Sequence, residues 1–183
     1  MTLAHKNDVG LRLVRGSEPD ASLDEIYRRY CRYVAAVILR LRGRPDDLDD
    51  LIQDVFVEAA RGIERLRDPE AIKGWLATIA VRLVRRRLRM QRLKRFLGLD
   101  RGGDGARAVD GAASPADKLL LVEVYGILDR LPVDDRVAFT LHHIEGETLG
   151  AVARLSGCSL ATTKRRIARA QAVIEATLGN GHG

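Results

Sequence analysis

Apolar residues recur at intervals of three and four along most of this chain, the spacing that places them on one face of an α-helix. A first series covers residues 23–41, follows a capping box formed by Ser22 and Glu25, and stops before Gly43. A second series covers residues 48–63. The pattern therefore predicts that the chain opens with two amphipathic helices joined by a short turn.

A third helix is predicted to begin at Asp68-Pro69, because aspartate caps a helix well and proline is tolerated in its first turn. Its apolar series runs over residues 72–88. Residues 98–118 then lose the apolar period and include five glycines, which predicts a flexible linker. Helical spacing returns in four segments, at about residues 120–131, 134–144, 147–156 and 160–178.

These segments predict an all-α protein of two small helical domains, since no stretch shows the alternating pattern of a β-strand. The first domain would cover residues 1–97 and the second residues 119–183, with residues 98–118 as the linker between them. The composition agrees with this fold class. The chain is 46% apolar but only 4% aromatic, which suits packed helices better than a β-sandwich.

The charge of the chain indicates its partners. It carries 31 Lys and Arg against 25 Asp and Glu, a net charge of +6, so polyanions are the first partners to consider. The excess belongs to residues 1–97, with 21 basic and 14 acidic side chains, whereas residues 119–183 hold seven of each. No apolar run is long enough to cross a bilayer and no signal peptide is evident, so we expect a cytoplasmic protein.

The sequence shows no catalytic or metal-binding constellation. Cys31 and Cys158 stand alone inside apolar patterns, which indicates small core residues rather than a disulfide or a zinc site. His142 and His143 have no third ligand at a metal spacing. We therefore expect no cofactor, no metal and no enzymatic activity.

The last two predicted helices form a candidate helix-turn-helix, a motif whose second helix enters the major groove of DNA. Gly157 suits the turn because glycine tolerates a positive φ angle, and Ser159 can cap the second helix. Ile167 and Ala170 of that helix should face inward. Its polar side offers five candidate DNA contacts: Thr162, Lys164, Arg165, Arg166 and Arg169.

A second candidate surface is basic. Residues 81–95 carry eight basic side chains and no acidic one, and such a run needs an anionic partner because like charges repel. A membrane surface is one alternative. The apolar positions continue the period of residues 72–83, however, which indicates a helix whose apolar face is already buried in the domain. Nucleic acid is therefore preferred, with four candidate contacts: Arg82, Arg85, Arg86 and Arg89.

Three stretches together resemble the extracytoplasmic-function (ECF) sigma factors, the short two-domain group of the sigma-70 family of bacterial transcription initiation factors. They are DLIQDVF at residues 50–56, WLATIA at residues 75–80, and a pattern that joins Leu131-Pro132, Ala153 and GCSLATTKRRIARA at residues 157–170. Their order, spacing and separation by a linker make the combination specific. The resemblance covers about residues 22–95 and 119–176.

The resemblance implies a sigma factor that directs core RNA polymerase to specific promoters and initiates DNA-templated transcription. The first domain would be like sigma region 2, binding polymerase through Asp50, Gln53 and Asp54 and engaging the minus-ten promoter element. The second would be like sigma region 4, binding the minus-thirty-five element. Core polymerase and promoter DNA are the implied partners, and an anti-sigma factor is a further partner that the resemblance allows.

The chain departs from the family pattern at some positions. The family usually has Asn and Asp where this chain has Arg82 and Arg86, so the details of minus-ten recognition are not carried over. Thr163 stands at a usual core valine, and its hydroxyl should bond to the carbonyl one turn back.

Two questions stay open at this point. The alternative function is a stand-alone helix-turn-helix regulator that does not bind polymerase, which would leave the motifs at residues 50–56 and 75–80 unexplained. Trp75 can be a core anchor or can lie beside melted DNA. Three neighbouring acidic residues, Asp46, Asp47 and Asp49, are interpreted as helix caps.

Overall fold

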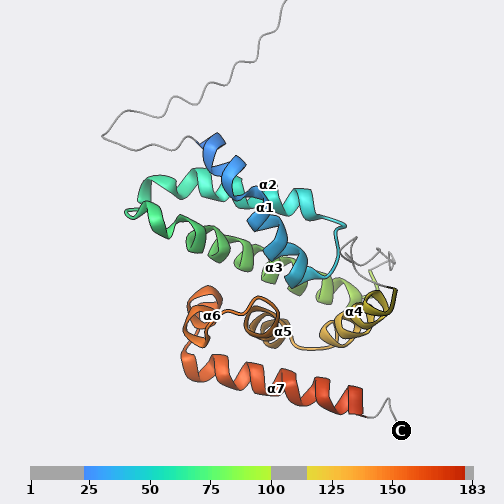
Figure 1. Ribbon diagram of the computed structural model, residues 1–183. Helices are drawn as coiled ribbons and strands as arrows, with labels where there is room; N and C mark the ends of the chain where they lie inside the picture. The colour runs from blue at the N-terminus through green and yellow to red at the C-terminus, as the bar shows by residue number, and fades with distance from the viewer. Residues whose placement is uncertain (1–22, 100–114, 180–183) are drawn as a thin grey trace, which may run out of the picture.

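The computed structural model describes residues 23–99 and 115–179, and the chain is helical in both parts (Figure 1). The first part contains three α-helices and two short 3-10 turns: α1 (Leu23–Arg42), α2 (Leu48–Gly62), η1 (Ile63–Arg65), η2 (Pro69–Ala71) and α3 (Ile72–Phe96). The second part contains α4 (Pro115–Leu128), α5 (Val133–Phe139), a π turn η3 (Thr140–Ile144), α6 (Leu149–Ser156) and α7 (Leu160–Gly179). Within these ranges there is no strand, so the all-α prediction is confirmed.

The helix boundaries follow the sequence signals closely. Asp68 caps the turn that leads into α3, since its side chain accepts a hydrogen bond from the backbone N–H of Glu70 at 2.9 Å. Ser22, the expected cap of α1, lies outside the described residues. Of the predicted linker, residues 100–114 also lie outside them, and residues 115–118 already belong to α4.

The interpretation of Asp47 as a helix cap is wrong. Asp47 stands at the N-cap position of α2, but its side chain makes no capping hydrogen bond. The carboxylate instead pairs with the buried Arg42 at 2.5 Å and with Arg87 of α3 at 2.6 Å. Two arginines thus take both oxygens, and Asp47 ties the ends of α1 and α3 together.

Helices α1, α2 and α3 bury their apolar stripes against one another. The fully buried side chains of this core include Val34, Leu41, Val55, Leu76 and Val84. Cys31 is only half-buried at its edge, and Cys158 is half-buried in the second part, so neither is the core residue that the sequence suggested. The spacing of apolar residues thus predicted the three packed faces correctly and the cysteines less well.

The same core continues into the C-terminal part. Val137, Leu141 and Val152 belong to the cluster that contains the core of α1, α2 and α3. In Figure 1, α3 lies between α1 and α2 on one side and α5, α6 and α7 on the other. A smaller cluster of Tyr125, Leu128, Leu131 and Ala170 holds α4 against α7. The two halves therefore pack as one body in this structure.

A buried arginine fastens the two halves. Arg136 of α5 is 3% exposed, and its guanidinium donates hydrogen bonds to the carbonyls of Leu41 at 2.9 Å and Arg42 at 2.7 Å. These carbonyls end α1 and have no N–H partner within the helix. Asp129 balances the charge of Arg136 from the C-terminal half. Burial lowers the pKa of Arg136 and the neighbouring Asp129 works to raise it.

A second contact lies beside the first. The hydroxyl of Tyr125 in α4 donates a hydrogen bond to the carbonyl of Arg40 at 2.9 Å. The Tyr125 ring rests on Gly43, where a Cβ atom would stand 2.3 Å from the ring and where φ is +67°. Only glycine combines that backbone conformation with so close an approach. Gly43 therefore both ends α1 and admits α4 to its surface.

Candidate DNA and polymerase interfaces

Helices α6 and α7 form the helix-turn-helix that the sequence predicted. Gly157 has a left-handed backbone with φ +61°, and its N–H closes α6 by a bond to the Arg154 carbonyl at 3.1 Å. Ser159 then caps α7, because its Oγ accepts a hydrogen bond from the backbone N–H of Thr162 at 3.2 Å. Both expectations for the turn are confirmed.

The inner face of α7 also follows the prediction. Ile167 and Ala170 are buried. Thr163 is fully buried, and its hydroxyl donates to the carbonyl of Ser159 at 3.2 Å, one turn back. Lys164 and Arg165 are exposed on the outer side. The beginning of α7 therefore presents two exposed basic side chains on a helix that is fixed from behind, and Arg165 also donates to the hydroxyl of Thr162 at 3.4 Å.

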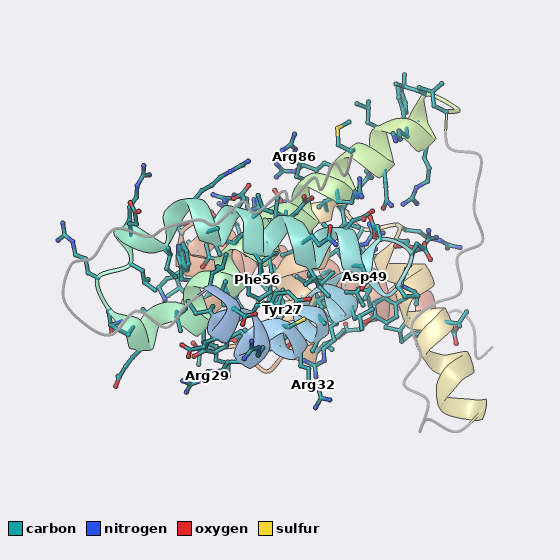
Figure 2. The ribbon with its side chains drawn as sticks, turned by 90° about the horizontal axis from the view of Figure 1, so that it is seen from above. Tyr27, Arg29, Arg32, Asp49, Phe56 and Arg86 are labelled. Carbon is teal, nitrogen blue, oxygen red and sulfur yellow. The ribbon has the colours of Figure 1, made fainter. Side chains whose placement is uncertain are left out.

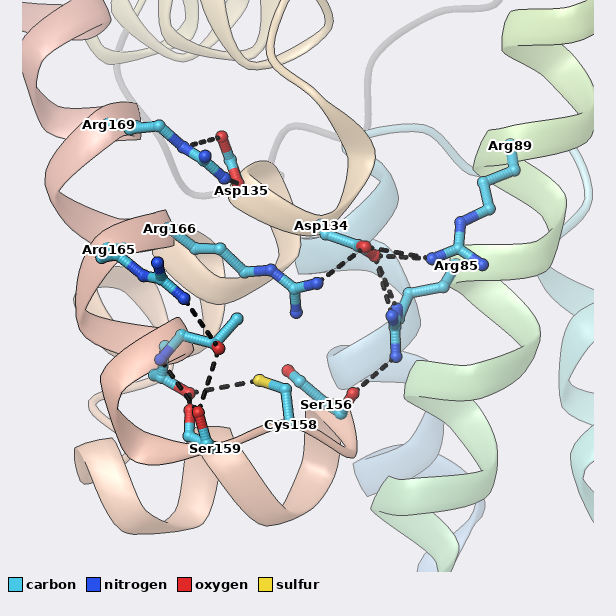
Figure 3. Close-up of polar contacts among 12 residues, drawn as sticks. Arg85, Arg89, Asp134, Asp135, Ser156, Cys158, Ser159, Arg165, Arg166 and Arg169 are labelled. Carbon is cyan, nitrogen blue, oxygen red and sulfur yellow. Dashed lines mark hydrogen bonds and ion pairs between the residues drawn. The ribbon is translucent and has the colours of Figure 1, made fainter.

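Two other basic residues of α7 are held by aspartates of α5. Arg166 pairs with Asp134 at 3.0 Å. Arg169 forms two hydrogen bonds with the buried Asp135, at 3.0 Å and 2.7 Å (Figure 3). These bonds raise the pKa of Arg169, which stays charged. The guanidinium groups of Arg166 and Arg169 are thus held in fixed positions by these aspartates.

The basic run on α3 is not unopposed in the folded chain. Arg82 pairs with Glu58 of α2, and Arg87 pairs with Asp47. Arg85 and Arg89 pair with Asp134 of α5, across the contact between the two halves. The sequence interpretation counted only the acidic residues within the run and missed the carboxylates that other helices bring to it. Arg86 is exposed and makes no ion pair with any residue of the described ranges.

Asp134 is the centre of the largest of these clusters (Figure 3). Its Oδ1 accepts from Arg85 Nε at 3.0 Å and Nη2 at 2.8 Å, and from Arg89 Nη2 at 2.9 Å. Its Oδ2 accepts from Arg166 at 3.0 Å. Burial works to raise the pKa of Asp134, but the hydrogen bond from Arg85 and the three positive charges outweigh it and lower that pKa.

The predicted polymerase-binding residues lie on α2, a helix that is apart from α5, α6 and α7 (Figure 1). Asp50, Gln53 and Asp54 are all exposed, and their spacing of three and four places them on one face. The intervening Leu51, Ile52 and Val55 are buried. Figure 2, seen from above, shows α2 in front of the C-terminal half, with Phe56 turned toward Tyr27 of α1 and Asp49 on the exposed side.

Trp75 at the start of α3 is a structural anchor in this fold. Its half-buried ring packs against the core and lies over Gly62, where a Cβ would stand 3.1 Å from the ring. Nearby, the ammonium group of Lys73 lies 4.7 Å from the centre of the Tyr33 ring, a cation–π contact. This end of the domain is therefore packed before any DNA is bound.

The sequence reasoning missed the role of three neighbouring residues at the start of α5. The sequence predicted a helical segment that begins at about Asp134, and it gave no role to Asp134, Asp135 or Arg136. Asp134 contacts residues that lie 49, 45 and 32 positions away, and Arg136 contacts carbonyls 95 and 94 positions away. No local signal in the sequence points to partners at such distances.

Comparisons with known proteins identify the two halves. Residues 26–94 match the family model described as Sigma-70 region 2, and residues 121–172 match the one described as Sigma-70, region 4. The chain is 31% identical over 159 residues to the ECF RNA polymerase sigma-E factor of Haemophilus influenzae, covering 80% of this chain and 82% of that protein. It is 28% identical over 156 residues to the sigma-E factor of Escherichia coli K12, covering 80% and 81%.

Solved structures resemble the fold as well. CnrH, determined in complex with the cytosolic domain of CnrY, is 26% identical with a TM-score of 0.59, over 86% of this chain and 88% of that one. The sigma factor RpoE of Bartonella quintana, determined with the anti-sigma factor NepR, has a TM-score of 0.61 at 23% identity, over 85% and 96%. The latter likeness concerns the fold alone.

The order of these matches defines the class of protein: a helical, two-part transcription initiation factor with a DNA-reading helix-turn-helix at its end. The chain belongs to the sigma-70 family, and within it to the ECF sigma factors. The resemblance read from the sequence is confirmed, and the stand-alone regulator is not favoured. No helix in the described ranges is long and apolar enough to span a membrane.

Proposed function

We propose that this sigma factor uses three surfaces to direct core RNA polymerase to promoters, of which the first two adjoin in a groove lined by Asp54 and Arg86. The exposed face of α2 binds polymerase. The arginine side of α3 binds DNA at the minus-ten element, and the outer side of α7 reads the minus-thirty-five element. The observation that carries this division is that one chain combines an exposed acidic face on α2 with a capped recognition helix, α7, on which Lys164 and Arg165 are exposed.

The α2 face suits a protein partner. Asp50, Gln53 and Asp54 project from a helix whose opposite face is locked into the core, so they are presented in a fixed geometry. Two carboxylates and an amide can accept and donate charge-assisted hydrogen bonds. They repel DNA phosphates, and a basic surface of polymerase is therefore their natural counterpart.

The α3 surface suits a polyanion. Four arginines, Arg82, Arg85, Arg86 and Arg89, follow one side of the helix, and their guanidinium groups bind phosphate in two-pronged geometry. Contacts with phosphates position a protein on DNA without reading its sequence. We assign this surface to holding the DNA strand near the minus-ten element.

The α7 surface suits base recognition in a major groove. Thr162, Lys164 and Arg165 lie in the first two turns of the helix, the part that enters the groove in this motif. Lys and Arg donate to guanine O6 and N7, and threonine contacts several bases. Arg166 and Arg169, further along, are held by aspartates and are suited to phosphate contacts at the edge of the groove.

This function needs no covalent chemistry and no cofactor, since the work consists of binding and positioning. It places the protein in the cytoplasm with the polymerase. The solved complexes of CnrH with CnrY and of RpoE with NepR support an anti-sigma factor as a further partner.

Transcription in vitro tests the proposal. Core bacterial polymerase is given a library of genomic fragments, with and without the protein. We expect defined transcripts that appear only with the protein and that start at promoters of a shared sequence. Transcripts that are the same in both reactions would contradict the proposed function.

A further inference from the structure

The arginines proposed to bind DNA are already bound to carboxylates in this structure. Arg85 and Arg89 from the first half and Arg166 from the second meet at Asp134. We propose that Asp134 is an intramolecular latch: it keeps the free chain closed, encloses Arg85 of α3 and holds the more exposed Arg89 in an ion pair until the two halves separate on polymerase. This inference rests on the proposed function for the role of α3.

The geometry of Arg85 excludes simultaneous DNA binding. Its Nε and Nη2 donate to Asp134, and its Nη1 donates to the carbonyl of Ser156 at the end of α6, at 2.7 Å. All three nitrogens of the guanidinium group are thus engaged by the C-terminal half, and the side chain is only 19% exposed. Arg85 can reach a phosphate only after α5 and α6 move away.

Asp134 offers Arg85, Arg89 and Arg166 the kind of anionic acceptor that a DNA phosphate also offers. A carboxylate offers two oxygens to arginine in nearly the same fork geometry as a phosphate does. Here it gathers Arg85 and Arg89 from one half and Arg166, 16% exposed, from the other. Around it, Arg89, Arg92, Arg166 and Arg169 line a cleft between the halves together with Asp134 and Asp135. A single acidic side chain therefore binds candidate DNA-contacting arginines from both halves.

Other contacts between the two halves show that the closed form is well packed. Val137, Leu141 and Val152 complete the core of the first half, and Arg136 caps the end of α1. Arg40 of α1 pairs with Glu145 at 2.7 Å. Apolar contacts between the halves are not directional. Asp134, in contrast, pairs with particular arginines, and these pairs fix which surfaces of the two halves face each other.

The α2 face stays accessible while Arg85 of α3 is enclosed. Asp50, Gln53 and Asp54 are exposed in the closed form and belong to α2, which lies apart from α5, α6 and α7 (Figure 1). Polymerase can therefore bind before the halves separate. The order that follows is docking through α2, separation of the halves, and release of Arg85, Arg89 and Arg166 for DNA.

The test compares the variant Asp134→Asn with the control variant Glu175→Gln, both as the full chain without polymerase. Both substitutions remove one negative charge, but Glu175 is exposed on α7 and forms no part of the cleft. Fluorescence anisotropy measures binding to a labelled DNA single strand and to a labelled duplex of arbitrary sequence, since phosphate contacts are independent of sequence. Small-angle X-ray scattering measures the radius of gyration of each variant.

We expect Asp134→Asn to bind both probes about tenfold more tightly than Glu175→Gln and to have a larger radius of gyration. Equal affinity of the two variants would overturn the latch. A gain in affinity without expansion would overturn it too, because it would mean that only Arg166 had been freed within a closed chain.

A third measurement separates this inference from the function on which it rests. Both variants and the parent are tested in the transcription assay with core polymerase. If none gives specific transcripts although Asp134→Asn expands and binds DNA more tightly, the proposed function fails and the latch stands. If all give specific transcripts while Asp134→Asn neither expands nor gains affinity, the latch fails and the function stands.

Discussion

Two surfaces of the same three-helix unit differ in what lies opposite them. The α2 face carries Asp50, Gln53 and Asp54 and is open to solvent. The α3 face carries a row of arginines, of which Arg85 is enclosed by α5 and α6. Both surfaces are polar and both lie on helices with one buried side. The difference shows that packing between the halves, rather than charge, decides which of these polar side chains are exposed.

The open surface should give the largest effect on mutation. Replacing Asp50, Gln53 and Asp54 together by alanine should weaken binding to core polymerase by about 3 kcal/mol, more than a hundredfold, because two charged and one neutral hydrogen-bonding groups are lost. Helix content and melting temperature should stay near those of the parent, since all three side chains are exposed.

Competition binding to labelled core polymerase checks this prediction, with Glu64→Ala as the control because Glu64 is an exposed carboxylate outside α2. A triple variant that competes as well as the parent would show that the α2 face is not the polymerase surface.

The second largest effect is expected for mutations in the recognition helix, α7. Lys164→Ala should cost about 1–3 kcal/mol at a single base pair of the minus-thirty-five element and leave the other positions unchanged, because a side chain that reads one base loses only that discrimination. Binding of the holoenzyme to single-base variants of a promoter recovered from the genomic library measures it. The control Arg130→Gln removes an exposed charge outside α7. A uniform loss over all promoter variants would make Lys164 a phosphate contact instead.

The covered surface should respond differently in the free chain and in the holoenzyme. Arg86 has no ion-pair partner among the described residues, whereas Arg85 is bound to Asp134 and Ser156. Arg86→Gln should therefore reduce the slope of log affinity against log salt by about 0.7–0.9 in both states, and Arg85→Gln only in the holoenzyme.

Titration of DNA binding between low and moderate salt measures both slopes. Arg32→Gln, which removes an exposed arginine of α1 well away from α3, should leave both slopes unchanged (Figure 2). If Arg85→Gln reduces the salt slope of the free chain as much as Arg86→Gln does, Arg85 is not covered by the C-terminal half in solution.

The sequence predicted what depends on neighbouring residues. Gly157 and Ser159 form the expected turn and cap, and the Thr163 hydroxyl bonds to the carbonyl four residues before it. Each of these contacts lies within five residues of its partner. Backbone geometry and helix periodicity are enough to infer such contacts, because a regular helix fixes the relative position of residues one turn apart.

The sequence did not predict how the halves meet. Helical spacing predicted the segments at residues 134–144 and 147–156, but nothing in it indicated that Val137, Leu141 and Val152 would join the core of α1, α2 and α3. Arginine usually lies on the surface of a protein, but Arg136 is buried. It donates hydrogen bonds to carbonyls more than ninety positions away. A glycine-rich segment between two periodic regions suggested independent domains, and such a segment carries no information on whether the domains pack together.

The smallest effect expected concerns pH. The pKa of Asp134 is lowered in the closed form because Arg85 and Arg89 of α3 and Arg166 of α7 outweigh the cost of burial. A group with a lowered pKa contributes its stabilisation above the ordinary aspartate value of about 3.9 and loses it as the pH falls through the lowered pKa. The Asp134 contact should therefore be unchanged between about pH 6 and pH 8.

Scattering at both pH values checks this, and the radius of gyration should be the same. Glu145, whose pKa burial raises against the pull of Arg40, would favour the closed form slightly more as the pH falls, so it does not work toward opening. Burial lowers the pKa of His143, so its protonation works against the packed state as the pH falls, and the chain used for this comparison carries His143→Gln. Expansion of that chain on going from pH 8 to pH 6 would contradict the role given to Asp134.

The most direct test of the central claim is DNA binding by the chain alone and with core polymerase added, on one promoter recovered from the library. The claim is that the chain binds polymerase through an open surface and DNA through surfaces that are partly covered until then. A mobility shift should show weak binding of the promoter by the free protein and tight, sequence-specific binding once core polymerase is present. Tight, specific binding by the free protein that polymerase does not improve would contradict it.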